Sequence, residues 1–128
     1  MISQVAALTF TVVACAVIAF QVGLALGAPW GRFAMGGAFP GRFPPPLRIA
    51  ALVQAAVVAA LAIVVLSAAG VVIPDLTVRL PWLPWVPVAF SGVALVLNAM
   101  SRSAGERRLW IPATLVMLIS SLVVALAV

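Results

Sequence analysis

Only nine charged residues interrupt this chain, and they fall in three clusters that separate four long uncharged runs. The runs span residues 1–31, 49–74, 80–101 and 109–128 and contain 31, 26, 22 and 20 residues. A helix that crosses the hydrocarbon core of a bilayer needs about 20 apolar residues. Each run is therefore long enough to cross once, and none is long enough to cross twice. The pattern predicts an all-α integral membrane protein with four transmembrane helices.

The composition excludes a water-soluble monomer. Hydrophobic residues make up 66% of the chain and charged residues 7%, whereas soluble domains carry roughly 25% charged residues. The formal net charge of +5 comes from arginine alone. Because these arginines lie between the apolar runs, membrane topology explains them better than nucleic-acid binding, and no nucleic-acid partner is expected. The first run has no basic residue ahead of it and is too long for a signal-peptide core, so we expect it to stay as a helix.

The arginines predict the orientation of the chain. Two connections carry all but one of them, whereas Asp75 and Arg79 in the remaining connection cancel. Short basic loops stay in the cytoplasm, so both termini should face outward. Tryptophans prefer the membrane boundaries and agree with this threading: Trp30 and Trp110 fall at the inner boundary, Trp82 and Trp85 at the outer one. The arginines of the two basic connections are Arg32, Arg42, Arg48, Arg102, Arg107 and Arg108.

Helix ends follow from proline, glycine and capping residues, within a single domain of residues 1–128. We expect membrane spans at 3–27, 47–69, 82–100 and 109–127, joined by cytoplasmic loops 28–46 and 101–108 and an outer loop 70–81. Ser103 and Glu106 have capping-box spacing, so the last helix should begin near Ala104, ahead of its span. A faint echo between VIAFQVGLAL (17–26) and PVAFSGVALVL (87–97) would make the molecule two parallel helical hairpins.

A stripe of small residues spaced by four runs along the first helix and includes Cys15, Ala19, Gly23 and Gly27. In lipid, helix association depends on close backbone approach, which small residues allow. The stripe could pack against other helices of the chain, or it could form a surface for a second copy or another membrane protein. Packing within the chain is favoured, because a four-helix protein needs such seams anyway.

Four polar residues stand out within the apolar runs: Gln21, Gln54, Ser91 and Asn98. The three amides should lie in the inner leaflet, where they could converge. Amides in hydrocarbon must find partners, so hydrogen bonds between helices are the favoured interpretation. The alternative is a polar lining for a solute near the cytoplasmic mouth.

Catalytic chemistry is missing from the sequence. There is no histidine and only one cysteine, so a metal site lacks its usual ligands. The two carboxylates, Asp75 and Glu106, should lie on opposite sides of the membrane, which excludes a paired-carboxylate mechanism. No P-loop and no nucleophile elbow occur, and no span carries an ionisable group for proton coupling. We expect a non-enzymatic protein with no cofactor and no metal.

The connection at 28–46 is too long for a bare turn and repeats GRF at 31–33 and 41–43. It could be an anchor on the inner leaflet, a re-entrant segment or a mobile loop, and its interleaved arginine and aromatic residues favour the anchor. The six arginines of the two basic connections could hold an anion or an anionic lipid head group beside a helix N-terminus. The favoured interpretation is a plain positive-inside loop, with Glu106 used for capping.

The residues of both basic connections also carry a resemblance. GAPWG with the following GG, PG and Arg48, and then Asn98, Ser101, Ser103, Glu106, Arg107, Trp110 and Pro112, resemble a pattern in small, uncharacterised bacterial inner-membrane proteins with four helices. The resemblance covers about half the chain. It implies the same layout and brings no activity with it.

These observations favour a small multi-pass protein of the bacterial inner membrane that acts by association. It would be a non-enzymatic accessory subunit of a larger membrane complex or a self-assembling, likewise non-enzymatic bundle, with its basic face toward anionic phospholipid. The alternative is an oligomeric channel or carrier for a small solute or anion. A weaker third possibility is a lipid-modifying enzyme that borrows its catalytic groups from another subunit.

Overall fold

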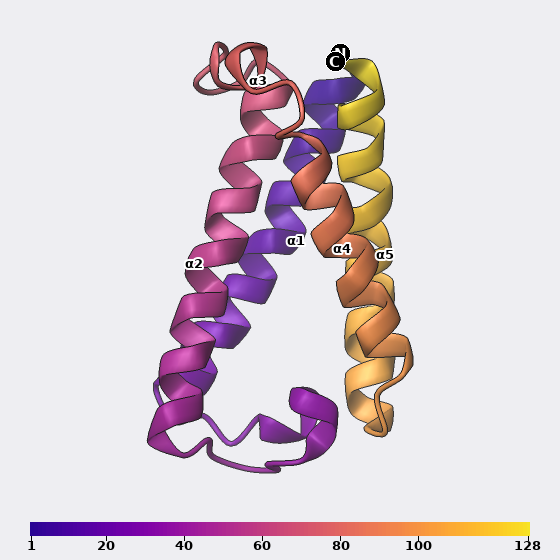
Figure 1. Ribbon diagram of the computed structural model, residues 1–128. Coiled ribbons are helices and arrows are strands. Elements are labelled where there is room, and N and C mark those ends of the chain that lie inside the picture. Colours follow the sequence, from indigo (N-terminus) through magenta and orange to yellow (C-terminus); the bar gives the residue numbers. More distant parts are fainter.

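The computed structural model describes all 128 residues as a bundle of helices without strands (Figure 1). Three helices have 24 residues each and are long and apolar enough to cross a membrane; a fourth is apolar but shorter. The all-α fold is therefore confirmed, and it is compatible with a membrane helical bundle. The elements in chain order are α1 (Ile2–Ala25), the 3-10 turns η1 (Gly31–Phe33) and η2 (Met35–Gly37), α2 (Pro45–Ala68), α3 (Leu76–Arg79), α4 (Trp85–Ala99) and α5 (Ala104–Ala127).

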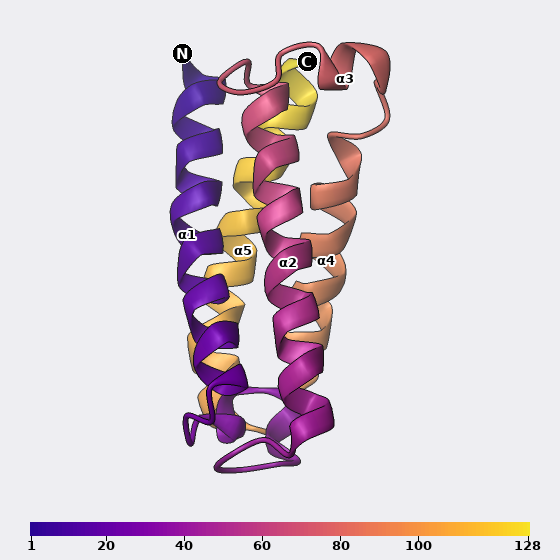
Figure 2. The same ribbon diagram turned by 90° about the vertical axis from the view of Figure 1, so that its left-hand side faces the viewer.

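Both chain termini lie at one end of the bundle, which we call the terminal end (Figures 1 and 2). Helices α1 and α4 run away from that end, and α2 and α5 return to it. The closest helix pairs are α1 with α2, α4 with α5, and α1 with α5. The opposite end holds the connections before α2 and before α5 and so collects six of the seven arginines. We call it the basic end.

The helix boundaries follow local chemistry. After α1 the chain turns at Gly27, which has a φ of 95° that favours glycine. Helix α2 begins at Pro45, in the first turn where a missing N–H costs nothing. Helix α4 begins at Trp85, three residues later than expected, because a turn that ends at Pro84 precedes it. Helix α5 begins at Ala104 as expected.

The packed core occupies the half of the bundle near the terminal end. Small side chains let the helices approach closely there, and Phe10 is fully enclosed among them. The core consists of Ala6, Ala7, Phe10, Ala14, Val58, Leu61, Ala62, Val65, Ala69, Met117 and Val124. At the basic end the hydrophobic core is only a small cluster of Leu24, Phe43 and Ala51, and the helices spread apart toward that end (Figure 1).

The small-residue stripe of α1 does not form the seam that the sequence predicts. Cys15 and Ala19 are exposed, and the buried line of the helix passes through Phe10 and Ala14 instead. The expectation that the stripe packs within the chain is therefore wrong for its middle. A strict spacing of four drifts around a helix of 3.6 residues per turn, so the stripe leaves the buried face. Farther along, Gly23 lies against the Trp30 ring.

Candidate functional site

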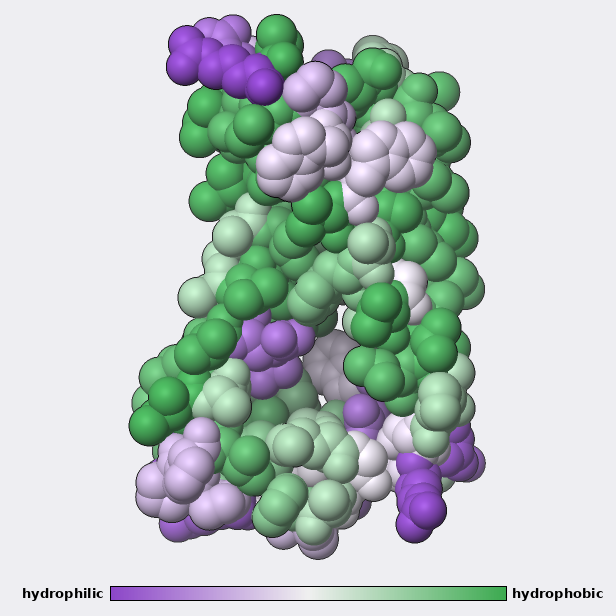
Figure 3. Space-filling view, viewed as in Figure 1, coloured by the Kyte–Doolittle hydropathy of each residue, from purple (hydrophilic) through white to green (hydrophobic).

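A cavity of about 740 Å³ lies in the half of the bundle near the basic end. The helices α1, α2, α4 and α5 and the connection between α1 and α2 line it, and 17 of the 26 lining residues are hydrophobic. The space-filling view shows the hollow open on the face between α2 and α4 (Figure 3). Pockets that enclose drug-sized ligands measure roughly 300–1,000 Å³, so the cavity has the size and the apolar character of a ligand site.

The connection between α1 and α2 closes the cavity at the basic end by docking on the start of α5. The indole Nε1 of Trp110 donates to the Phe33 carbonyl at 2.8 Å, and the backbone N–H of Gly36 donates to Glu106 Oε2 at 2.7 Å. The Ser103 hydroxyl donates to the Arg32 carbonyl. The connection is thus a floor docked beneath the helices, not a free loop.

The glycines of this floor explain its unusual composition. The two GRF segments meet where the N–H of Gly31 donates to the Gly41 carbonyl at 2.9 Å. A Cβ at Gly31 would lie 1.8 Å from the Phe39 carbonyl oxygen, so only glycine fits. A Cβ at Gly105 would lie 2.8 Å from the Phe33 ring. Glycine on both partners therefore allows the connection to approach α5 closely.

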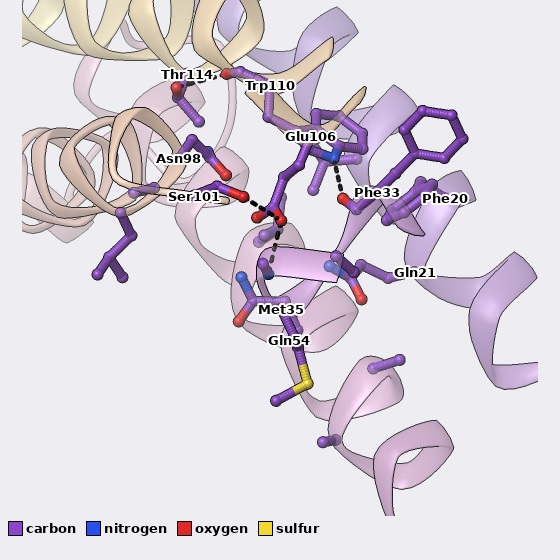
Figure 4. A pocket seen from close by; sticks show the side chains of 18 of the residues that line it. Phe20, Gln21, Phe33, Met35, Gln54, Asn98, Ser101, Glu106, Trp110 and Thr114 are labelled. Carbon is purple, nitrogen blue, oxygen red and sulfur yellow. Dashed lines mark hydrogen bonds between the residues drawn. The ribbon is translucent and has the colours of Figure 1, made fainter. Parts of the chain in front are cut away.

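Glu106 is the one acidic side chain of the cavity and is only 8% exposed. The Ser101 hydroxyl donates to Glu106 Oε2 at 2.9 Å, so this oxygen receives both hydrogen bonds and Oε1 receives none from the chain (Figure 4). Ser103 Oγ accepts from the Glu106 amide as the capping box predicts. The reciprocal half is wrong: the Ser103 amide donates to Ser101 Oγ instead, because the carboxylate is taken up by the floor.

The three membrane amides meet at this cavity, as the sequence predicts, but they do not bond to each other. Gln21 from α1, Gln54 from α2 and Asn98 from α4 all line it (Figure 4), and none makes a side-chain hydrogen bond within the chain. The favoured interpretation of interhelical hydrogen bonds is therefore wrong. The helices diverge toward the basic end and hold the amides around a hollow. Ser91 lines the same cavity, is fully buried, and its hydroxyl has no partner.

Aromatic rings complete the wall. Phe20 contacts the edge of Trp110 with ring centroids 4.8 Å apart, and it stacks on Trp30 at 6.0 Å. Trp110 is therefore a wall and floor residue and not simply a boundary anchor. Trp30 is 42% exposed, and Trp82 and Trp85 are exposed near the terminal end, positions that suit boundary anchors.

The six arginines at the basic end have different roles. Arg48 donates from Nε to the Phe43 carbonyl at 2.8 Å, and Arg107 donates to the Ser101 carbonyl, so both hold backbone. The Arg32 guanidinium lies 4.6 Å from the Phe33 ring centroid. Of the exposed arginines, Arg42 and Arg108 are not among the residues that line the cavity, whereas Arg102 is.

Comparisons with protein-family models, curated proteins and solved structures gave no match. No group of three or more His, Cys, Asp or Glu side chains comes together that could hold a metal ion. The function must therefore be argued from the cavity itself. Its chemistry is an apolar, aromatic wall with three amides, three hydroxyls from Ser91, Ser101 and Thr114, one carboxylate and the guanidinium of Arg102. The sequence points to the three amides and Ser91, but its capping-box spacing assigns Glu106 to helix capping. The signal for a second role is that Glu106 is the only acidic residue in the connection at 101–108.

Proposed function

We propose that this chain is a multi-pass inner-membrane protein that binds a small amphiphilic molecule between its helices. One observation carries the proposal: the three amides and the Ser91 hydroxyl gather on one cavity without hydrogen-bond partners in the chain. An amide in hydrocarbon needs a hydrogen-bonding partner, and several that converge without bonding to each other are arranged to receive one from outside.

The shape of the cavity supports an amphiphile over an ion or a sugar. The opening between α2 and α4 lies on an apolar face, so a ligand dissolved in the bilayer could enter from the side (Figure 3). Most of the lining is hydrophobic and would accept an apolar body, while the amides would fix a polar group. This proposal develops the carrier alternative. Binding alone is proposed here, with no transport step.

The proposed orientation places the basic end in the cytoplasm. Short basic connections are retained on that side, and the exposed Arg42 and Arg108 are free to meet anionic phospholipid. The cavity would then lie in the cytoplasmic half of the membrane.

We also propose that α4 is a fourth span. Its 15 residues give about 22 Å at 1.5 Å per residue, less than the roughly 30 Å of a hydrocarbon core. The apolar turn before Trp85 and the residues after Ala99 lengthen the segment, and α4 packs beside α5 along its length (Figure 1).

Ligand-induced stabilisation tests the proposed binding. The purified protein is melted with a panel of aryl compounds that are cationic, neutral or anionic. A ligand that binds only the folded state, at a free concentration 100 times its dissociation constant, adds about 2.7 kcal/mol to the free energy of unfolding. At least one compound should therefore raise the melting temperature by several degrees. Ala94→Trp fills the cavity and should abolish that rise, whereas Val93→Trp on the exposed neighbouring position should keep it. If no compound class stabilises the wild type, the proposal fails.

A second function, association, is favoured by the exposed middle of the α1 stripe. Cys15 and Ala19 are left free by the chain's own packing, so this face suits a second copy or a larger membrane protein. Cys15 is the sole cysteine, which makes a direct test available. A short bismaleimide applied to native membranes should give a cross-linked species that Cys15→Ser lacks. Recovery of monomer alone would argue against association through this face.

A further inference from the structure

The inference rests on the proposed binding function and concerns the charge of the ligand. We propose that the ligand is a lipophilic organic cation, an apolar body that carries an ammonium or similar onium group, and that Glu106 is its counter-ion.

Glu106 is poorly satisfied by its own chain. The side chain is 8% exposed, and both hydrogen bonds that it accepts fall on Oε2. A carboxylate can accept about four hydrogen bonds, and a buried carboxylate is normally paired with a cation. No arginine is among its hydrogen-bond partners. The start of α5 contributes a partial positive charge, but Oε1 is left for a group in the cavity.

The unpartnered hydroxyl of Ser91 independently points to an occupant. Its oxygen is fully buried, and Ser91 is one of the α4 residues that line the same cavity as Glu106. Seven residues separate Ser91 from Asn98, which is about 10 Å along the helix. The polar groups are therefore spread over the length of a drug-sized molecule and do not cluster as they would around a single water.

The wall near Glu106 suits an organic cation better than a bare one. Trp110 lines the cavity together with Glu106, and its hydrogen bond to the Phe33 carbonyl fixes its position (Figure 4). The Phe33 ring also lines the cavity, but the Arg32 guanidinium already lies over it, so Trp110 is the ring left for a ligand. Aromatic faces attract cations, most strongly where water is excluded. Met35 and Met117 add adaptable apolar surface.

The two charged residues of the lining differ in burial, and that difference decides the sign of the ligand. Arg102 is exposed, so water screens it, whereas Glu106 is buried and acts through a medium of lower dielectric constant. The amides and the hydroxyl can serve a ligand of either sign. An anionic ligand would have to place its charge beside an unpaired carboxylate, which disfavours the solute-anion alternative.

Three probes of similar shape and different charge test the inference: tetraphenylphosphonium, triphenylphosphine oxide and tetraphenylborate. Binding to the purified full-length protein is measured by calorimetry and by the shift in melting temperature. Tetraphenylphosphonium should bind saturably and more tightly than the other two. Glu106→Gln keeps an oxygen that can accept from Gly36 and Ser101, so the floor should stay docked. The affinity of the Glu106→Gln protein for tetraphenylphosphonium should fall about 30-fold or more. This is the lower end of the loss expected when one partner of a buried charge pair is removed.

Asp75→Asn is the matched control, because it removes the same charge at the terminal end and should leave affinity unchanged. Equal cation binding by wild type and Glu106→Gln, or preference for the borate, overturns the inference. Binding of the neutral oxide alone overturns the cation but keeps the cavity function, whereas no binding by any probe defeats both. If Glu106→Gln does not fold, the three probes on the wild type still decide the sign.

Discussion

The two halves of this bundle are built from the same helices, yet one is closely packed and the other is hollow. Near the terminal end, Ala7, Phe10 and Ala14 of α1 are fully buried against α2 and α5. Toward the basic end, the same helices line a cavity of about 740 Å³. Apart from Gln4, which donates to the Ala69 carbonyl, the glutamine and asparagine side chains lie only in the hollow half.

Side-chain size explains much of the contrast. Alanines in the packed half let backbones approach, as small residues do in membrane helices. Bulky rings stand between the helices in the other half, where Phe20 meets Trp110 and Phe43 is buried against Leu24. The connection docked beneath then keeps the helices apart. The packed half thus supplies stability, and the hollow half is where the proposed ligand would bind.

The largest expected effect is on stability and separates the halves directly. Phe10→Ala should lower the free energy of unfolding by about 3 kcal/mol or more, because it leaves a void in a close-packed region. Ala94→Leu, which adds bulk to the cavity wall, should change it by less than about 1 kcal/mol. Both are measured by denaturation in mixed micelles. Similar losses for the two variants would show that the hollow half is packed as closely as the other.

The next effect concerns the floor that divides cavity from solvent. Gly31→Ala places a Cβ against the Phe39 carbonyl and should loosen the connection. Trypsin can report this at Arg32 and Arg42, and cleavage should speed up about tenfold if opening becomes easier by 1.4 kcal/mol. The control is Gly92→Ala in α4, whose Cβ would make only an ordinary contact at 3.9 Å with Leu118. Unchanged cleavage of the Gly31 variant would mean that the floor is not held as described.

The coarse architecture could be predicted because its signals are local. Uncharged runs mark the long helices, and the cap at Ser103 marks the start of α5. The use of Glu106 could not be predicted from its spacing, because its partner Gly36 lies 70 residues away. The position of Cys15 was likewise misjudged, since the buried face of α1 depends on how the neighbouring helices are rotated.

The smallest expected effect is the change in stability when an amide of the cavity is replaced. It distinguishes a structural role of the amides from a role in ligand binding. Interhelical hydrogen bonds in membranes contribute about 0.6 to 2 kcal/mol. Removing an amide that joined two helices should therefore lower the free energy of unfolding of the protein. Gln54 and Asn98 have no partner in the chain, so Gln54→Leu and Asn98→Leu should change the free energy of unfolding by less than about 0.5 kcal/mol or raise it slightly. The same variants should weaken binding of an aryl ligand. Loss of stability with unchanged binding would show that the amides are structural. The two halves would then differ only in the interactions that stabilise them, hydrogen bonds of amides in one and apolar packing in the other.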